Sequence, residues 1–115
     1  MPDAHLPVRI RSQGDAVIVS VSGELDLASV PIFMEAIEKA IAPEFGGRRL
    51  VLDLLDLSFM DSSGLGAILA LQERHPGTQL ALVVGEGIVE RVLETTAMHK
   101  LLRIVPSVAE ALVEG

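Results

Sequence analysis

One short stretch of the sequence carries the side chains best suited to chemistry: Asp56-Leu57-Ser58-Phe59-Met60-Asp61-Ser62-Ser63-Gly64-Leu65-Gly66. It lies between an apolar run typical of a buried strand and a pattern typical of a helix. Asp61, Ser62 and Ser63 therefore stand at a predicted helix N-terminus, where backbone N–H groups lack helical partners and favour negative charge. A phosphate on a hydroxyl there would be held by the helix, which suits a phosphorylation switch that changes the surface without unfolding the protein.

The same stretch also has a purely structural interpretation. Asp and Ser are preferred N-cap residues, and Gly64 and Gly66 would let a neighbouring backbone approach closely. On this interpretation the motif is a well-capped helix whose small residues pack on a sheet. Ser63 is the rival of Ser62 as a site of modification, although a capping or contact role suits Ser63 better.

Periodicity predicts the elements that surround this stretch. Residues 8–11 alternate apolar and basic side chains, Gly14-Asp15 is typical of a turn, and residues 16–22 are rich in Val and Ile, so residues 8–22 are predicted to form an antiparallel hairpin. Residues 56–61 are expected to be a connection. The other elements expected are strands at 50–55, 79–84 and 101–105 and helices at 30–41, 62–75, 87–97 and from Pro106 onward. Together they predict an α/β fold: an N-terminal antiparallel hairpin that leads into a mixed sheet of about five strands, mostly parallel, with about four helices.

Length and composition limit the organisation of the chain. Its 115 residues suit one domain, and we expect a single domain over residues 1–115 with a core from about 8 to 112. Half of the residues are apolar, which predicts a packed core rather than disorder. The sequence has no cysteine, so disulfides, thiolate catalysis and iron–sulfur clusters are excluded.

The charge balance bears on the partner. Nine basic and sixteen acidic residues give a formal net charge of −7. Such a surface repels phosphate backbones and anionic lipids, so we expect no direct nucleic-acid or membrane partner and favour a basic protein surface. The longest apolar run, Leu65 to Leu71, is far too short to span a bilayer. We therefore expect a cytoplasmic protein.

Other patterns point to chemistry only weakly. The residues from Gly85 to Glu90 resemble half of a dinucleotide-binding fingerprint, but Glu90 stands where the third glycine belongs and would repel a pyrophosphate. His5, His75 and His99 are scattered over different elements, which argues against a zinc site. The serines have no evident histidine base. We therefore expect no metal, no cofactor and no enzymatic activity.

Two motifs together resemble a known family. Gly23-Glu24-Leu25-Asp26 and the stretch from Leu57 to Gly66 are similar to the STAS domain of bacterial anti-sigma factor antagonists, particularly those of sporulation and general stress. The likeness in the order and spacing of elements extends from about Val8 to Leu112. It implies a regulator that binds an anti-sigma factor that is also a serine kinase, and so frees a sigma factor. The kinase then uses ATP to phosphorylate the antagonist, which lets go, and a metal-dependent serine phosphatase resets it.

The resemblance also assigns roles to residues. The acceptor is the hydroxyl residue directly after the Asp of the Asp-Ser-Ser-Gly pattern, here Ser62, and Asp26 matches a position beside it. A partner-binding patch is then expected from Asp26, Asp61, Ser63 and Gly64 around the acceptor. The alternative is a scaffold STAS subunit of a signalling assembly or a lipid transporter, without a phospho-switch. The lack of a convergent nucleophile, base and metal argues against a third alternative, a small enzyme.

The sequence departs from the family at the end of the third predicted helix. The family often carries Ser/Thr-Gly-Leu there, whereas this chain has Thr96-Ala97-Met98. The missing glycine concerns the local turn and not the fold.

Overall fold

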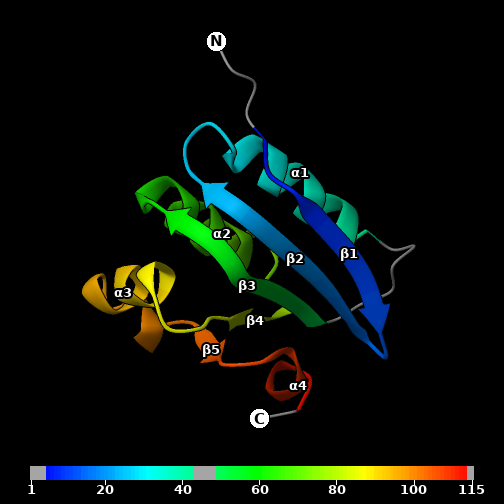
Figure 1. The fold of residues 1–115 in the computed structure, drawn as a ribbon. Coiled ribbons are helices and arrows are strands. Elements are labelled where there is room, and N and C mark those ends of the chain that lie inside the picture. Colours follow the sequence, from blue (N-terminus) through cyan, green and yellow to red (C-terminus); the bar gives the residue numbers. More distant parts are fainter. Residues whose placement is uncertain (1–4, 43–48, 114–115) are drawn as a thin grey trace.

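The predicted hairpin and the later strands assemble into one five-stranded sheet (Figure 1). The computed structural model describes residues 5–42 and 49–113. The strands are β1 (Val8–Gln13), β2 (Ala16–Leu25), β3 (Arg49–Met60), β4 (Gln79–Val83) and β5 (Arg103–Val105). They lie side by side in sequence order; β1 is antiparallel to β2, and every later neighbour is parallel. The predicted mixed sheet is confirmed.

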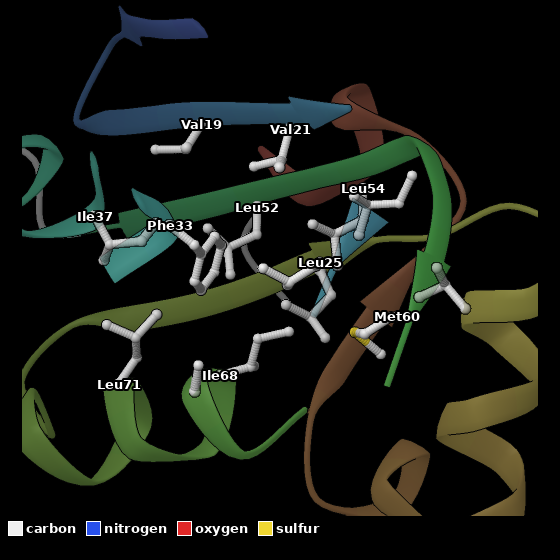
Figure 2. Close-up of a cluster of buried hydrophobic side chains, with 14 of the residues drawn as sticks. Val19, Val21, Leu25, Phe33, Ile37, Leu52, Leu54, Met60, Ile68 and Leu71 are labelled. Atoms are coloured by element: carbon white, nitrogen blue, oxygen red, sulfur yellow. The ribbon is translucent and has the colours of Figure 1, made fainter. Parts of the chain in front are cut away.

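The helices cover the two faces of this sheet unequally. They are α1 (Val30–Ala40), α2 (Ser62–Arg74), α3 (Ile88–Thr95) and α4 (Val108–Ala111), with a short 3-10 turn, η2 (Met98–Lys100), after α3. The first three helices bury apolar side chains in one large cluster with the strands. Figure 2 shows Phe33 of α1 and Ile68 of α2 pointing toward Leu52 of β3 in this cluster. Of these four helices, only α4 packs on the smaller cluster of the other face, through Ala111 and Val108.

The prediction of a connection over residues 56–61 is wrong, because β3 continues to Met60. This part of β3 pairs with the end of β2, with Asp56 opposite Ser22 and Met60 opposite Leu25, and two register shifts interrupt the pairing. Gly23 allows one irregularity through its positive φ of 89°. The ribbon of β2 and β3 therefore extends beyond β4, which pairs only with residues 49–53 of β3.

Two details of the last third differ from expectation. The final helix begins at Val108 and not at Pro106, because Ser107 is its N-cap and its Oγ accepts the N–H of Glu110 at 3.2 Å. Ala97, in place of the family's glycine, adopts the left-handed conformation at φ 59°. The turn after α3 thus forms without glycine.

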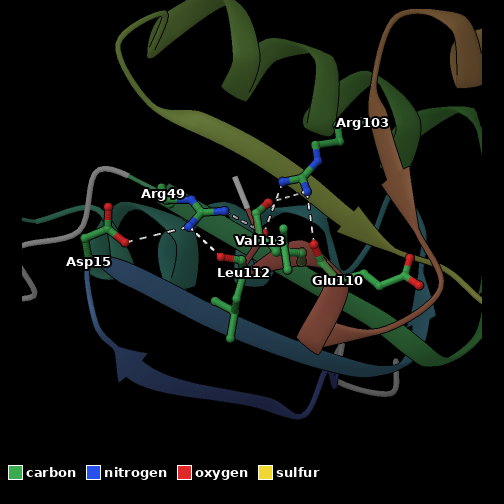
Figure 3. A network of polar contacts seen from close by, with 7 residues as sticks. Asp15, Arg49, Arg103, Glu110, Leu112 and Val113 are labelled. Atoms are coloured by element: carbon green, nitrogen blue, oxygen red, sulfur yellow. Dashed lines mark hydrogen bonds and ion pairs between the residues drawn. The ribbon is translucent and has the colours of Figure 1, made fainter. Parts of the chain in front are cut away.

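Two arginines hold the last turn of α4 at the amino end of the sheet (Figure 3). Arg49 begins β3, and its Nη1 and Nη2 donate to the carbonyl oxygens of Leu112 and Ala111, both at 2.8 Å. Arg103 of β5 donates to three carbonyl oxygens of the same segment, those of Glu110, Ala111 and Val113. Helix C-termini leave such carbonyl groups without helical partners. The buried guanidinium of Arg49 is therefore explained by the structure that it supports.

Candidate protein-interaction site

Asp61 forms the N-terminus of α2. Its backbone is extended, and its carboxylate accepts hydrogen bonds from the backbone N–H groups of Ser63 at 2.9 Å and Gly64 at 3.1 Å. These are two of the donors that every helix N-terminus leaves without helical partners. Asp61 is thus the N-cap, and Ser62 is the first residue of the helix.

A backbone contact joins this helix start to the end of β2. The Asp61 N–H donates to the carbonyl oxygen of Leu25 at 3.3 Å. Asp26 and Ser62 each lie one residue beyond this bonded pair. Figure 1 shows β2 and β3 ending next to each other, with α2 beginning at the same place. The two motifs, distant in sequence, therefore meet at the carboxyl end of the sheet.

The two adjacent serines differ in exposure. Ser62 is exposed, and within residues 5–42 and 49–113 its hydroxyl makes no hydrogen bond to another protein group. Ser63 is half-buried, and its N–H is occupied by the Asp61 carboxylate. Of the two hydroxyls, that of Ser62 is the more accessible to an approaching partner.

Gly64 faces the core beneath the site. A Cβ atom at this position would lie 2.9 Å from Cγ of Leu25, 2.9 Å from Cγ of Met60 and 3.0 Å from the Leu25 carbonyl oxygen. These distances are too short for a real Cβ, so only glycine lets the first turn of α2 sit on the end of the sheet. Gly64 is buried, and it therefore shapes the site from beneath.

Asp26 belongs to a tight turn between β2 and α1. Its Oδ1 accepts the N–H of Ser29 at 3.0 Å, and the Oγ of Ser29 accepts the N–H of Asp26 at the same distance. That Oγ also donates to the carbonyl oxygen of Glu24 at 2.7 Å. Ser29 is only 3% exposed. The turn fixes the carboxylate of Asp26, and Ser29 is a residue that sequence reasoning missed; the Asp-x-x-Ser spacing before Pro31 is the signal that could have found it.

Two apolar side chains at this end of the sheet also escaped the sequence analysis. Leu27 follows the Asp26 position and is 75% exposed, and Phe59 near the end of β3 is 36% exposed. Hydropathy alone could not find them, because it predicts burial for both. The carboxylates at the same end are those of Glu24, Asp26, Asp56 and Asp61. The site thus combines an accessible hydroxyl, fixed carboxylates and exposed apolar groups.

Two other kinds of feature are absent from residues 5–42 and 49–113. Residues 5–42 and 49–113 contain no cluster of three or more His, Cys, Asp or Glu side chains that could hold a metal ion. No helix in those ranges is long and apolar enough to cross a membrane.

Comparison with known proteins identifies the family of this chain. The STAS domain family matches residues 7–111. This chain belongs to the STAS-domain family. The match includes both motifs at the carboxyl end of the sheet, so the resemblance predicted from them is confirmed.

Relatives of this STAS domain are similar over nearly their whole length. It is 30% identical over 112 residues to the anti-sigma F factor antagonist of Paenibacillus polymyxa, which covers 96% of this chain and 95% of that protein. The crystal structure of an anti-sigma factor antagonist from Mycobacterium paratuberculosis has 27% identity and a TM-score of 0.86, over 97% of this chain and 94% of that one. The unphosphorylated form of the anti-sigma factor antagonist SpoIIAA, at 22% identity, shares the fold with a TM-score of 0.73 over 92% and 93% of the two chains.

Proposed function

We propose that this STAS domain is an anti-sigma factor antagonist controlled by phosphorylation. In the proposed cycle, the unphosphorylated form binds an anti-sigma factor serine kinase and so releases a sigma factor. Transfer of the γ-phosphoryl group of ATP to the Ser62 hydroxyl ends the binding, and a serine phosphatase restores the free hydroxyl. The protein itself is a binding partner and not a catalyst in this cycle.

The observation that carries the proposal is the exposed hydroxyl of Ser62 at the first position of α2. Because Asp61 already satisfies the N–H groups of Ser63 and Gly64, the helix start does not depend on the Ser62 side chain. A kinase can therefore modify this hydroxyl without taking away a contact that the fold needs.

Charge explains how one phosphate would change binding more than folding. It adds about −1.5 to −2 charges at pH 7. The helix N-terminus attracts this charge by roughly 0.3–1 kcal/mol, whereas the carboxylates of Asp26 and Asp61 repel it. These opposing effects leave the free energy of unfolding nearly unchanged. A partner that covers the site, however, would have to desolvate the phosphate beside two carboxylates.

The relatives support the class of partner. The matching protein of Paenibacillus polymyxa is named as an antagonist of the anti-sigma F factor, and the similar Mycobacterium paratuberculosis structure is that of an anti-sigma factor antagonist. SpoIIAA, which shares the fold, has been solved in unphosphorylated and phosphorylated forms. An anti-sigma factor is therefore the first partner to test.

The first test identifies the acceptor. Wild type, Ser62→Ala and Ser63→Ala are each incubated with ATP, Mg²⁺ and the purified anti-sigma factor serine kinases of the same genome, and intact masses are measured. Wild type and Ser63→Ala should each gain one phosphate, and Ser62→Ala should gain none. Labelling of Ser62→Ala to the wild-type extent would show that the acceptor lies elsewhere.

The second test asks whether charge at position 62 is sufficient. Ser62→Asp should weaken binding to the anti-sigma factor by about 2–5 kcal/mol, or roughly thirtyfold and more, because an imperfectly paired carboxylate is buried in the interface. Ser62→Ala should bind tightly and stay bound in the presence of ATP. Calorimetry measures the affinities, and thermal unfolding should give similar Tm values for all three proteins. A folded Ser62→Asp variant with wild-type affinity would exclude local charge as the mechanism.

The same calorimetry separates the alternative. A scaffold STAS subunit of a signalling assembly or a lipid transporter would bind none of the anti-sigma factors in either state of Ser62. Absence of binding by the unphosphorylated wild type would therefore favour the scaffold function over the proposed one.

A further inference from the structure

Large apolar side chains are exposed at the same end of the sheet as Ser62. Leu27 is 75% exposed and Phe59 is 36% exposed. The chain has only three phenylalanines and no Tyr or Trp, and Phe33 is fully buried. Phe59 is thus a rare aromatic side chain that the fold leaves partly in water, next to a residue, Met60, that fills the core.

The backbone places both residues near the start of α2. Phe59 precedes the N-cap Asp61 by two residues. Leu27 follows Leu25 by two residues, and the Leu25 carbonyl oxygen accepts the Asp61 N–H at 3.3 Å. The turn after β2 and the end of β3 therefore lie at the same end of the sheet as Ser62, since parallel neighbouring strands end together.

The charge around these two side chains has one sign. Residues 12–38 and 50–73 contain no Lys or Arg, and they cover β2, β3 after Arg49, α1 up to Glu38 and α2 up to Glu73. Glu24 of β2 and Asp56 of β3 are both exposed, and they lie on the paired segments of these two neighbouring strands. Protein interfaces commonly have an apolar centre, in which aromatic residues are enriched, and a polar rim. This edge has both parts, with a rim that is wholly acidic.

We propose that Leu27 and Phe59 are the apolar anchors of the anti-sigma factor interface, and that the carboxylate rim selects a partner surface with an apolar centre bordered by Lys or Arg. This inference rests on the proposed function and adds to it the residues that provide affinity. An uncharged residue at position 62 would leave the contacts of these anchors intact, whereas a phosphate on Ser62 would bring charge against the partner's apolar centre and oppose binding.

The anchors are tested by three alanine variants and one charge variant. Leu27→Ala and Phe59→Ala should each weaken binding of the purified anti-sigma factor at least tenfold, as expected for interface residues that contribute most of the affinity. The matched control is Leu101→Ala, because Leu101 is 62% exposed but precedes β5, which lies two strands away from β3 in the sheet. It should bind within twofold of wild type. Asp56→Asn should slow association and reduce its dependence on salt concentration.

Each outcome decides the inference. Thermal unfolding monitors the fold, and if Phe59→Ala is destabilised, Leu27→Ala decides alone because its side chain is mostly in water. If wild type binds and both anchor variants bind within twofold of it, this inference is overturned while the proposed function stands. If wild type binds no anti-sigma factor, the proposed function fails and the anchors fail with it. Weak anchor variants beside an unaffected Leu101→Ala would establish the interface.

Discussion

The two ends of the sheet use the same helix chemistry for different purposes. At the amino end, Arg49 and Arg103 donate hydrogen bonds to the carbonyl oxygens at the end of α4, and Arg49 is only 8% exposed. At the carboxyl end, the Asp61 carboxylate accepts two N–H groups of the first turn of α2, those of Ser63 and Gly64. The cations meet a helix C-terminus and the carboxylate meets an N-terminus, as the helix dipole favours in each case.

The difference lies in what remains available to a partner. The guanidinium groups of Arg49 and Arg103 are occupied with backbone carbonyls. The hydroxyl of Ser62 has no such task among the described residues, and Leu27, in the turn after β2 at the same end of the sheet, is mostly in water. A polar side chain whose hydrogen bonds are made within the fold has a structural role. One that stays accessible near exposed apolar groups is more typical of a binding surface. Substitutions at the amino end should therefore change stability, and those at the carboxyl end should change binding.

Gly64 should give the largest effect, because it is the point where folding and binding at the carboxyl end depend on each other. In Gly64→Val, the new Cβ would overlap Leu25 and Met60, including a backbone oxygen that cannot move easily. We expect a loss of about 3 kcal/mol or more in the free energy of unfolding, measured by urea denaturation, together with a displaced Ser62 and weak binding.

The matched control for Gly64 lies on the same helix. A Cβ on Gly66 would have no heavy atom within 4 Å, and Gly66 is exposed. Gly66→Val should therefore leave the free energy of unfolding within about 0.5 kcal/mol of wild type, since valine and glycine are both poor helix formers. Equal destabilisation by the two variants would mean that helix propensity, and not contact with the sheet, explains the requirement for glycine.

Arg49 tests the amino end. Arg49→Met keeps the apolar stem but leaves the carbonyl oxygen of Leu112 without its donor, while Ala111 keeps Arg103. We expect a loss of about 2–3 kcal/mol and a Tm lower by roughly 10 °C, with unchanged affinity of the folded protein for the anti-sigma factor. Asp15→Asn is the control, because its carboxylate is 3.9 Å from Arg49 Nη1 and 58% exposed, where an ion pair adds little. If Arg49→Met lost binding without losing stability, the contrast between the two ends would be wrong.

The sequence predicted well what depends on near neighbours. The cap at Asp61 could be expected because the carboxylate and its two N–H partners lie within three residues. The parallel strands could be expected from their apolar runs and the helices between them. The hydrogen bonds from Arg49 to α4, in contrast, join residues more than sixty positions apart. Nothing in the sequence around Arg49 indicates which carbonyl groups it will meet.

The extension of β3 was missed for a related reason. Asp56, Ser58 and Phe59 are exposed, so residues 56–60 lack the regular alternation that identifies a strand. Their pairing comes from β2, a distant segment that contributes its own irregularity at Gly23. The exposed anchors were missed with it, because the exposure of Leu27 and Phe59 depends on where the strands end. The site's polar residues could thus be predicted, but its apolar part required the structure.

The smallest effect should come from Ala97, which takes part in neither polar network. Ala97 follows α3 with φ 59°, a conformation that glycine adopts without the steric cost that a Cβ brings. Its N–H donates to the Glu94 carbonyl oxygen at 3.1 Å, so the turn already satisfies a helix end. Ala97→Gly should therefore raise the free energy of unfolding by about 0.5–1 kcal/mol in urea denaturation, even though glycine makes the unfolded chain more flexible.

The control for Ala97 is the same substitution in a regular helix. Ala109 is exposed within α4, and Ala109→Gly should lower the free energy of unfolding by up to about 1 kcal/mol. If Ala97→Gly raises the free energy of unfolding and Ala109→Gly lowers it, the left-handed backbone at Ala97 is the cause of the stabilisation. The affinity of Ala97→Gly for the anti-sigma factor should equal that of wild type, because stability changes here without any change at the carboxyl end of the sheet. A stabilised Ala97→Gly with altered affinity would mean that binding follows global stability, and the proposed division between a structural end and a recognition end would then fail.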